Sequence, residues 1–222
     1  MTDLDAVPPG GLAADARPVV AAFDFDGTLT VRSQLEPFVL QAGGLRRSSL
    51  AVARSLVKVV QLPRSSAHRD AAKAAVLHRV FEGIDEGSYA ALGQSFALHV
   101  LASKMRADSL ARLRWHQEHG HSTVIVSASL STYLDPIGTR LGIDGVLCTT
   151  LESAGGKLTG RLVGANVRGT EKARRLDAWL TERFGTTEVT LWAYGDTAGD
   201  RAMLERADHA TWVKRQETVP QI

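Results

Sequence analysis

The sequence AFDFDGTLT occupies residues 22–30 and overlaps the end of a short apolar run, Val19–Phe23. A bounded apolar run of this length is typical of a buried strand. Side chains two residues apart on an extended segment point the same way, so Asp24 and Asp26 are expected side by side just beyond it. Ligands of open parallel sheets bind at the carboxyl ends of strands. The stretch therefore predicts a strand that ends in a functional site.

The two carboxylates predict a bound cation. Neighbouring carboxylates repel each other unless a cation or a shared proton offsets their charge. Mg²⁺ suits such a pair, because it takes oxygen ligands from one or two carboxylates, from water and from substrate phosphate. An Asx turn that ends the strand is the plainer alternative, and Asp26-Gly27 alone would support it. The whole run of residues 22–30 favours the metal.

Further strands and helices are expected to alternate along the chain. Short apolar runs occur at Val19–Phe23, Thr123–Val126, Val146–Cys148, Val189–Tyr194 and Thr211–Val213. Helical patterns at Ser103–His119 and Glu171–Phe184 each end at a glycine, where a helix C-terminus is favoured. This alternation predicts an α/β fold, a Rossmann-like three-layer sandwich with a mainly parallel sheet. Residues 151–163 instead predict a hairpin that turns at Gly155 and Gly156.

Residues 31–103 lack strand signals, and four helical stretches follow one another. They are Gln34–Ala42, Leu45–Leu62, Ala67–Phe81 and Glu86–Ala102. The pattern predicts an all-helical insert after the first strand. We expect a flexible leader at 1–17, a core domain formed by 18–30 and 104–222, and a helical cap domain at 31–103.

A second acidic motif, YGDTAGD at residues 194–200, follows the apolar run Val189–Tyr194. Its carboxylates, Asp196 and Asp200, can complete a metal site with the first motif. An ordinary helix N-cap is the alternative for a Gly-Asp pair before a helix, and it stays open here.

A phosphate cradle is expected between the two motifs in sequence. Ser127 ends an apolar run, where its hydroxyl and the following backbone N–H of Ala128 can hold phosphoryl oxygens. Lys172 stands near the start of a helix and can neutralise charge there. Gly27 and Thr28 belong to the same expected phosphate-binding group.

The composition of the chain limits the kinds of molecule that it is expected to bind. The 222 residues carry a formal charge of +2, with a pI near 8.9, which is far from the dense basic surface of a nucleic-acid-binding protein. Cys148 is the single cysteine, so no internal disulfide can form. The N-terminus lacks a secretory signal pattern, and the sequence lacks an apolar run of bilayer length. We expect a cytoplasmic protein without an integral membrane segment, as a monomer or a homodimer.

The order of these motifs resembles the haloacid dehalogenase superfamily from about Pro18 to Val213. The helical insert is similar to the type 1 cap of its phosphoserine phosphatase-like branch, subfamily IB. The resemblance implies a Mg²⁺-dependent phosphatase that forms an aspartyl-phosphate. It implies the following roles: Asp24 as nucleophile, Asp26 as general acid/base, Mg²⁺ held by Asp24, the Asp26 carbonyl and Asp196, support of the metal by Asp200, and phosphoryl binding by Ser127 and Lys172.

The resemblance is weaker for substrate recognition. The phosphoserine enzymes of that branch carry a glutamate nine residues past the nucleophile, which binds the substrate ammonium. Ser33 stands there in this chain, and Glu36 follows three residues later. Arg79 is the candidate stand-in for their carboxylate-binding arginine. We therefore expect the cap to choose the substrate and phosphoserine to be a poor one.

Several functions stay open beside hydrolysis of a small phosphorylated metabolite. Residues 50–62 are apolar with isolated cations, which would suit a phosphorylated lipid or lysolipid and weak peripheral membrane contact. Burial against other cap helices explains the same pattern. A phosphoserine phosphatase and a phosphomutase-like transferase are further alternatives. A non-catalytic phosphate-binding regulator is disfavoured, because the acids and Lys172 are all intact.

Three histidines, His116, His119 and His121, cluster at the end of the Ser103–His119 pattern. Apart from Glu118, no cysteine or carboxylate accompanies them at a spacing suitable for a metal site. We interpret them as cations that stabilise a helix C-terminus.

Overall fold

The computed structural model describes residues 17–43 and 66–213. The strands are β1 (Val19–Phe23), β2 (Ser122–Leu130), β3 (Gly145–Thr149), β4 (Leu151–Ala154), β5 (Lys157–Leu162), β6 (Thr190–Gly195) and β7 (His209–Trp212). The helices are α1 (Leu35–Gly43), α3 (Ser66–Phe81), α4 (Glu86–Ser103), α5 (Ala107–Glu118), α6 (Ser131–Leu141), α7 (Thr170–Phe184) and α8 (Arg201–Glu205). The predicted stretch Leu45–Leu62 lies outside the described residues.

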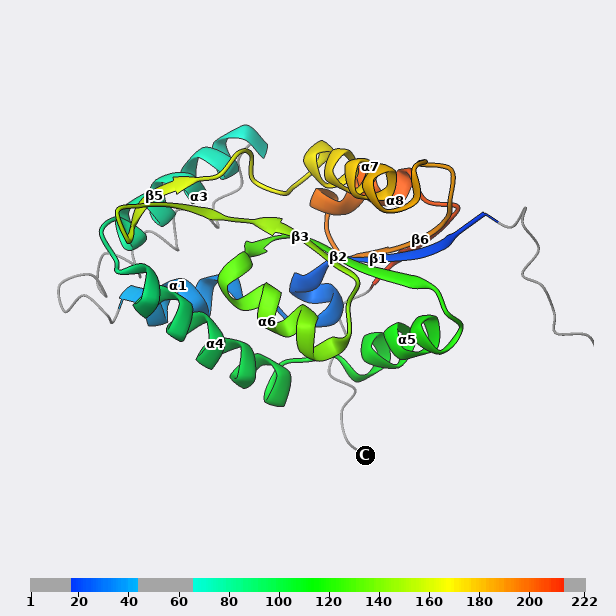
Figure 1. Ribbon diagram of the computed structural model, residues 1–222, viewed down its shortest axis with the longest axis horizontal. Helices are drawn as coiled ribbons and strands as arrows, with labels where there is room; N and C mark the ends of the chain where they lie inside the picture. The colour runs from blue at the N-terminus through cyan, green and yellow to red at the C-terminus, as the bar shows by residue number, and fades with distance from the viewer. Residues whose placement is uncertain (1–16, 44–65, 214–222) are drawn as a thin grey trace, which may run out of the picture.

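Five strands form one parallel sheet in the order β3-β2-β1-β6-β7. All five predicted runs are present in it, which confirms the α/β class. The alternating side chains of β1 explain the layers, since Ala21 and Phe23 enter one buried cluster while Val20 and Ala22 enter another. Helices α5 and α6 cover the first face, and α7 and α8 cover the second (Figure 1). The strand β1 is thereby buried on both faces at the centre of the sheet.

Helices α1, α3 and α4 lie beside one end of the sheet (Figure 1). An aromatic cluster joins them to α6 of the sheet layer and consists of Phe38, Phe81, Tyr89, Phe96 and Tyr133. Their ring centroids lie 4.8 to 6.0 Å apart in these pairs, within the range of favourable aromatic contacts. None of the helices that the structure describes combines the length and apolarity needed to cross a bilayer.

The hairpin formed by β4 and β5 packs against α3 and the turn that follows it, apart from the central sheet. Its turn matches the prediction, since Gly155 and Gly156 have φ values of 57° and 75°, which two-residue hairpin turns favour. The backbone N–H of Leu158 donates to the Ile84 carbonyl at 2.9 Å, and that of Gly83 donates to the Leu158 carbonyl at 2.8 Å. The sequence division placed the hairpin with residues 104–222, but its contacts join it to the helices of residues 31–103.

The interpretation of His116 as a helix-end cation is wrong. His116 is fully buried, its Nε2 shares a hydrogen bond of 2.8 Å with the Tyr194 hydroxyl, and its Nδ1 lies 2.8 Å from Nδ1 of His121. Burial lowers the pKa of His116 to about 4, and the charges of His121 and Arg112 add to this effect. The His116 imidazole is therefore neutral near pH 7 and serves as a buried hydrogen-bonding group.

Acidification is expected to destabilise the fold through His116. The unfolded histidine titrates near its ordinary pKa of 6.5 and the folded one near 4, so the unfolded chain binds the proton first. Stability should fall as the pH drops below about 6.5, by roughly 2 kcal/mol between pH 7 and pH 5 from this group. Urea unfolding of the wild type and of His116→Gln at both pH values measures it. An equal pH dependence in the two proteins would contradict the assignment.

Candidate active site

The first acidic motif begins where β1 ends. Asp24 is 5% exposed, and its backbone N–H donates to the Tyr194 carbonyl of β6 at 2.9 Å. The next residues, Phe25–Leu29, form a single wide helical turn, closed by the Thr30 N–H on the Phe25 carbonyl. Gly27 has a φ of 87° in this turn, a value that strains residues with a side chain. The turn brings Asp26 back beside Asp24 instead of continuing the strand.

Asp26 is held from two sides. Its Oδ2 accepts a hydrogen bond of 2.6 Å from the Ser129 hydroxyl, and its Oδ1 accepts one of 2.8 Å from the backbone N–H of Gln34. Burial raises the pKa of Asp26, although these two donors and the nearby Lys73 act in the opposite direction. An oriented carboxyl group with a raised pKa is suited to give and take protons.

Lys172 links the two acidic motifs. Its Nζ lies 2.5 Å from Oδ1 of Asp24 and 2.5 Å from Oδ1 of Asp200, and its side chain is 2% exposed. Burial alone would lower the pKa of Lys172, but the two carboxylates outweigh it and raise the pKa, so the ammonium stays charged. Burial raises the pKa of Asp24 to about 7, because it outweighs the attraction to Lys172. A metal cation bound beside Asp24, in addition to Lys172, would favour the ionised form of Asp24.

The second motif orients Asp196 and Asp200 differently. Thr197, and not Asp196, is the N-cap of the short turn Ala198–Asp200, so the N-cap alternative is wrong for Asp196. Asp200 is the N-cap residue of α8, and its carboxylate takes part in the capping box of Thr197. Both oxygens of Asp200 have partners, since Oδ1 accepts from Lys172 and Oδ2 accepts from the backbone and hydroxyl of Thr197. Oxygens of Asp24, Asp196 and Asp200 lie within 4.8 Å of one another. Three carboxylates at this spacing can hold a divalent metal.

A cavity of about 220 Å³ opens above these groups. Most of the residues singled out from the sequence line it: Asp24, Asp26, Gly27, Ser33, Ser127, Ala128, Lys172, Asp196 and Asp200. The structure thus brings together four segments of the chain that are remote in sequence. Ser127 does not end a strand as predicted, because β2 continues to Leu130 with an irregularity between Ser127 and Leu130.

Three expected site residues lie outside the lining of this cavity. Thr28 is fully buried, Glu36 is partly buried on α1, and Arg79 is exposed on α3. The position of Arg79 follows from the helix, since its neighbour Val80 faces the core instead.

Three residues near the site were not predicted from the sequence. Ser129 bonds Asp26, Arg168 lines the cavity, and Lys73 of α3 donates to the Ala128 carbonyl and, at 2.5 Å, to Oδ1 of Asn166. Lys73 lies within the predicted helical stretch Ala67–Phe81. Its helical position three residues before the buried Val76 was a usable signal, because it places both side chains on the same face.

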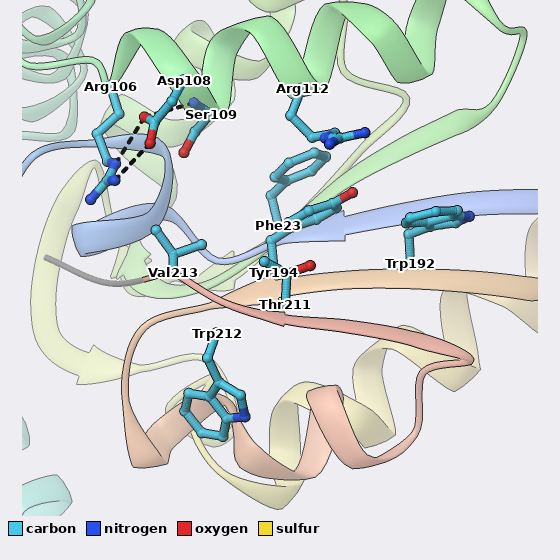
Figure 2. A pocket seen from close by; sticks show the side chains of 10 residues that line it. All are labelled: Phe23, Arg106, Asp108, Ser109, Arg112, Trp192, Tyr194, Thr211, Trp212 and Val213. Atoms are coloured by element: carbon cyan, nitrogen blue, oxygen red, sulfur yellow. Dashed lines mark hydrogen bonds and ion pairs between the residues drawn. The ribbon is translucent and has the colours of Figure 1, made fainter. Parts of the chain in front are cut away.

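A second cavity, of about 440 Å³, lies between α5 and the β6–β7 edge of the sheet (Figure 2). Its lining includes Phe23, Tyr194, and the ion pair of Arg106 with Asp108. Figure 2 shows this pair apart from the stacked rings of Phe23 and Tyr194. Although it is larger, this cavity brings no group of carboxylates together and is not the candidate active site.

The fold and the site define an α/β protein in which paired aspartates, a buried lysine and a second acidic loop meet at the carboxyl ends of parallel strands. The model of the haloacid dehalogenase-like hydrolase family matches residues 21–205. The chain therefore belongs to this family, as the order of its motifs implied.

Relatives and solved structures agree with this assignment. Protein CicA of Caulobacter vibrioides is 34% identical over 194 residues, which cover 86% of this chain and 84% of that protein. A crystal structure of a protein of unknown function from Bordetella pertussis Tohama I superposes with a TM-score of 0.74 at 22% identity, over 86% and 87% of the two chains. A phosphoserine phosphatase, solved as a phospho-aspartyl intermediate analogue, superposes with a TM-score of 0.61 at 16% identity, over 86% and 84%. The fold is that of the phosphoserine phosphatase-like branch.

Proposed function

We propose that this chain is a Mg²⁺-dependent phosphatase that hydrolyses a small phosphorylated metabolite through an aspartyl-phosphate on Asp24. The observation that carries the proposal is the bridge of Lys172 between Asp24 and Asp200, with Asp26 oriented beside it. A nucleophile held next to a fixed cation and a proton donor suits covalent phosphoryl transfer. The small cavity favours a small metabolite over a phosphorylated lipid.

The residues present fit a Mg²⁺ ion. Asp24 and Asp196 would hold it together with the backbone carbonyl of Asp26, while Asp200 would support it, because both Asp200 oxygens already accept hydrogen bonds. A Cβ at Gly27 would overlap the Asp196 carboxylate, so a glycine is needed to keep that ligand in place. When bound, Mg²⁺ would offset the negative charge of the carboxylates and of the substrate phosphate.

The side chains of this chain would divide the reaction into two steps. An Asp24 oxygen forms a bond to phosphorus while the bond to the leaving oxygen breaks, and Asp26 gives that oxygen a proton. Asp26, now ionised, then takes a proton from water as the water oxygen attacks phosphorus, which releases phosphate and restores Asp24. Ser127 and the Ala128 N–H would bind the phosphoryl oxygens, and Lys172 would balance the charge on them.

The helices of residues 31–103 would act as the cap that selects substrates by the alcohol part that leaves. The groups from the sheet loops recognise phosphate and metal, so discrimination has to come from what closes over the rest of the substrate. This segment contacts the site through Ser33, which is exposed at the cavity, through the backbone N–H of Gln34, which donates to Asp26, and through Lys73, which reaches the Ala128 carbonyl from α3.

Substitution of Ser33 by glutamate is expected to shift preference toward amino-bearing phosphomonoesters. The serine cannot pair with an ammonium group, whereas a glutamate at the cavity can. Because Ser33 is exposed, the gain should be about 3- to 10-fold in kcat/KM for phosphoserine relative to 3-phosphoglycerate. Phosphate release from the two substrates measures it. A wild type that hydrolyses phosphoserine better than every other compound of a broad panel would overturn this reading of the cap.

A panel of phosphorylated metabolites and lysolipids, assayed for inorganic phosphate, tests the proposed function. Hydrolysis releases one phosphate for each alcohol formed, whereas a phosphomutase-like transferase would form a new phosphate ester without matching phosphate. Phosphate release from small monoesters is the expected result. Transfer without release, or no turnover by an intact protein with Mg²⁺ across the panel, would contradict the proposal.

A further inference from the structure

Arg168 brings an additional cation to the active-site cavity. It lies in the loop before α7, and this loop is fixed because the Gly169 N–H donates to the Gly199 carbonyl at 2.8 Å. The Arg168 side chain crosses Gly199, with its Nε only 3.1 Å from the place that a Cβ there would occupy. Within residues 17–43 and 66–213, its guanidinium forms neither a side-chain hydrogen bond nor an ion pair. Its five donors therefore stay available to a ligand.

Arg168 is less buried than Lys172, which lines the same cavity. The Lys172 ammonium is 2% exposed and is committed to Asp24 and Asp200, whereas Arg168 is only partly buried, one helical turn earlier in the chain. Asp24 and Asp200 are buried like Lys172. Arg168 is thus available to the part of the substrate that leaves, because Ser127, the Ala128 N–H and Lys172 are the groups proposed to bind the transferred phosphoryl group.

Lys73 is a second cation close enough to Arg168 to sense its charge, although it is not among the residues that line the cavity. Its ammonium donates to the Ala128 carbonyl and to Asn166, whose amide donates in turn to Asp70 at 2.7 Å, so the side chain is held in one position. Burial lowers the pKa of Lys73 to about 8, while Asp26 and Asp70 raise it and the Arg168 and Lys172 charges lower it. The ammonium remains mostly charged at pH 7. The positive charges of Lys73 and Arg168 repel each other, and an anion bound at Arg168 would reduce that repulsion.

We propose that Arg168, supported by the nearby positive charge of Lys73, binds a second anionic group of the substrate, so that the preferred substrates are small phosphomonoesters that carry a carboxylate close to the ester oxygen. This inference rests on the proposed phosphatase function. The planar guanidinium matches a carboxylate with two parallel hydrogen bonds, a geometry that gives both affinity and orientation. A small cavity also favours a carboxylate within a few bonds of the phosphate.

Phosphoglycolate and ethyl phosphate form a matched pair of probes, because they share the phosphate and the two-carbon chain and differ in the carboxylate. The wild type should show a kcat/KM for phosphoglycolate at least about 10-fold above that for ethyl phosphate. This ratio should fall about 10-fold or more in Arg168→Gln. It should fall less in Arg168→Lys, because lysine keeps the positive charge but lacks the paired N–H donors of the guanidinium. The control Arg114→Gln, an exposed arginine of α5, should keep the wild-type ratio.

The outcomes separate this inference from the proposed function. Equal kcat/KM values for the two probes, or a ratio that Arg168→Gln leaves unchanged, would overturn the second-anion site while hydrolysis itself stands. If neither probe is turned over, calorimetric binding of both to the Asp24→Asn variant with Mg²⁺ decides instead. Tighter binding of phosphoglycolate that is lost on adding Arg168→Gln supports the site, and equal affinities overturn it. Thermal melts confirm that each variant is folded.

Discussion

Replacement of Asp24 by asparagine is expected to lower kcat at saturating substrate by at least about 10⁴-fold, because the amide cannot form the covalent intermediate. This is the largest effect expected from any single substitution in the chain. Substrate binding should survive, since Lys172, Ser127 and the neighbouring backbone remain. Phosphate release at saturating substrate measures the loss.

The fold of the Asp24→Asn variant should remain intact. Lys172 keeps Asp200 as its partner at 2.5 Å, and removal of one of three carboxylates within 4.8 Å relieves repulsion in the metal-free protein. Asp177→Asn is the matched control, because Asp177 lies on α7 and pairs with Arg206 away from the cavity. The control should retain activity within about 2-fold. Phosphate release at the wild-type rate by Asp24→Asn would refute the covalent mechanism.

Removal of divalent cations is expected to silence the enzyme, and added Mg²⁺ should restore it. Without a cation, the carboxylates of Asp24 and Asp196 would face the substrate phosphate as uncompensated negative charges. We expect a loss of about 10³-fold or more, since several kcal/mol of charge stabilisation disappear. Phosphate release after exhaustive chelation and dialysis, followed by titration with Mg²⁺, measures it. Full activity in the chelated protein would refute the metal assignment.

Mg²⁺ binding should also be visible without turnover. A ligand that binds only the folded state raises its stability, so millimolar Mg²⁺ should raise the melting temperature of the wild type. Asp196→Asn should reduce this rise, because the structure places its carboxylate within 4.8 Å of Asp24 and Asp200. Asp177→Asn serves again as the control. An equal shift in Asp196→Asn and the wild type would place the metal elsewhere.

The fold followed from local patterns that the structure retains. Bounded apolar runs predicted every strand of the central sheet, and Gly120 and Gly185 have φ values of 71° and 72° at the predicted helix ends. The hairpin was also predicted, but its packing against α3 was not. Its association with the inserted helices depends on backbone hydrogen bonds between Gly83, Ile84 and Leu158, which are distant in sequence and leave no local pattern.

The candidate site was predictable in its acids and its lysine, and less so in its supporting residues. The spacing of the acids within each motif and their positions after apolar runs identified them. Ser129 and Arg168 were missed because their significance depends on the continuation of β2 beyond Ser127 and on the close approach of a loop to Gly199. The neutral state of His116 was equally hidden, since the exposure of a helix-end histidine depends on what packs over it.

The covalent intermediate is the central claim, and acid quenching during turnover tests it most directly. The wild type is mixed with Mg²⁺ and a good substrate, quenched in acid, digested and examined by mass spectrometry. The peptide containing Asp24 should gain the mass of one phosphoryl group, and the same peptide from Asp24→Asn should not. Turnover at full rate with an unmodified Asp24, or with the phosphoryl group on another residue, would contradict it.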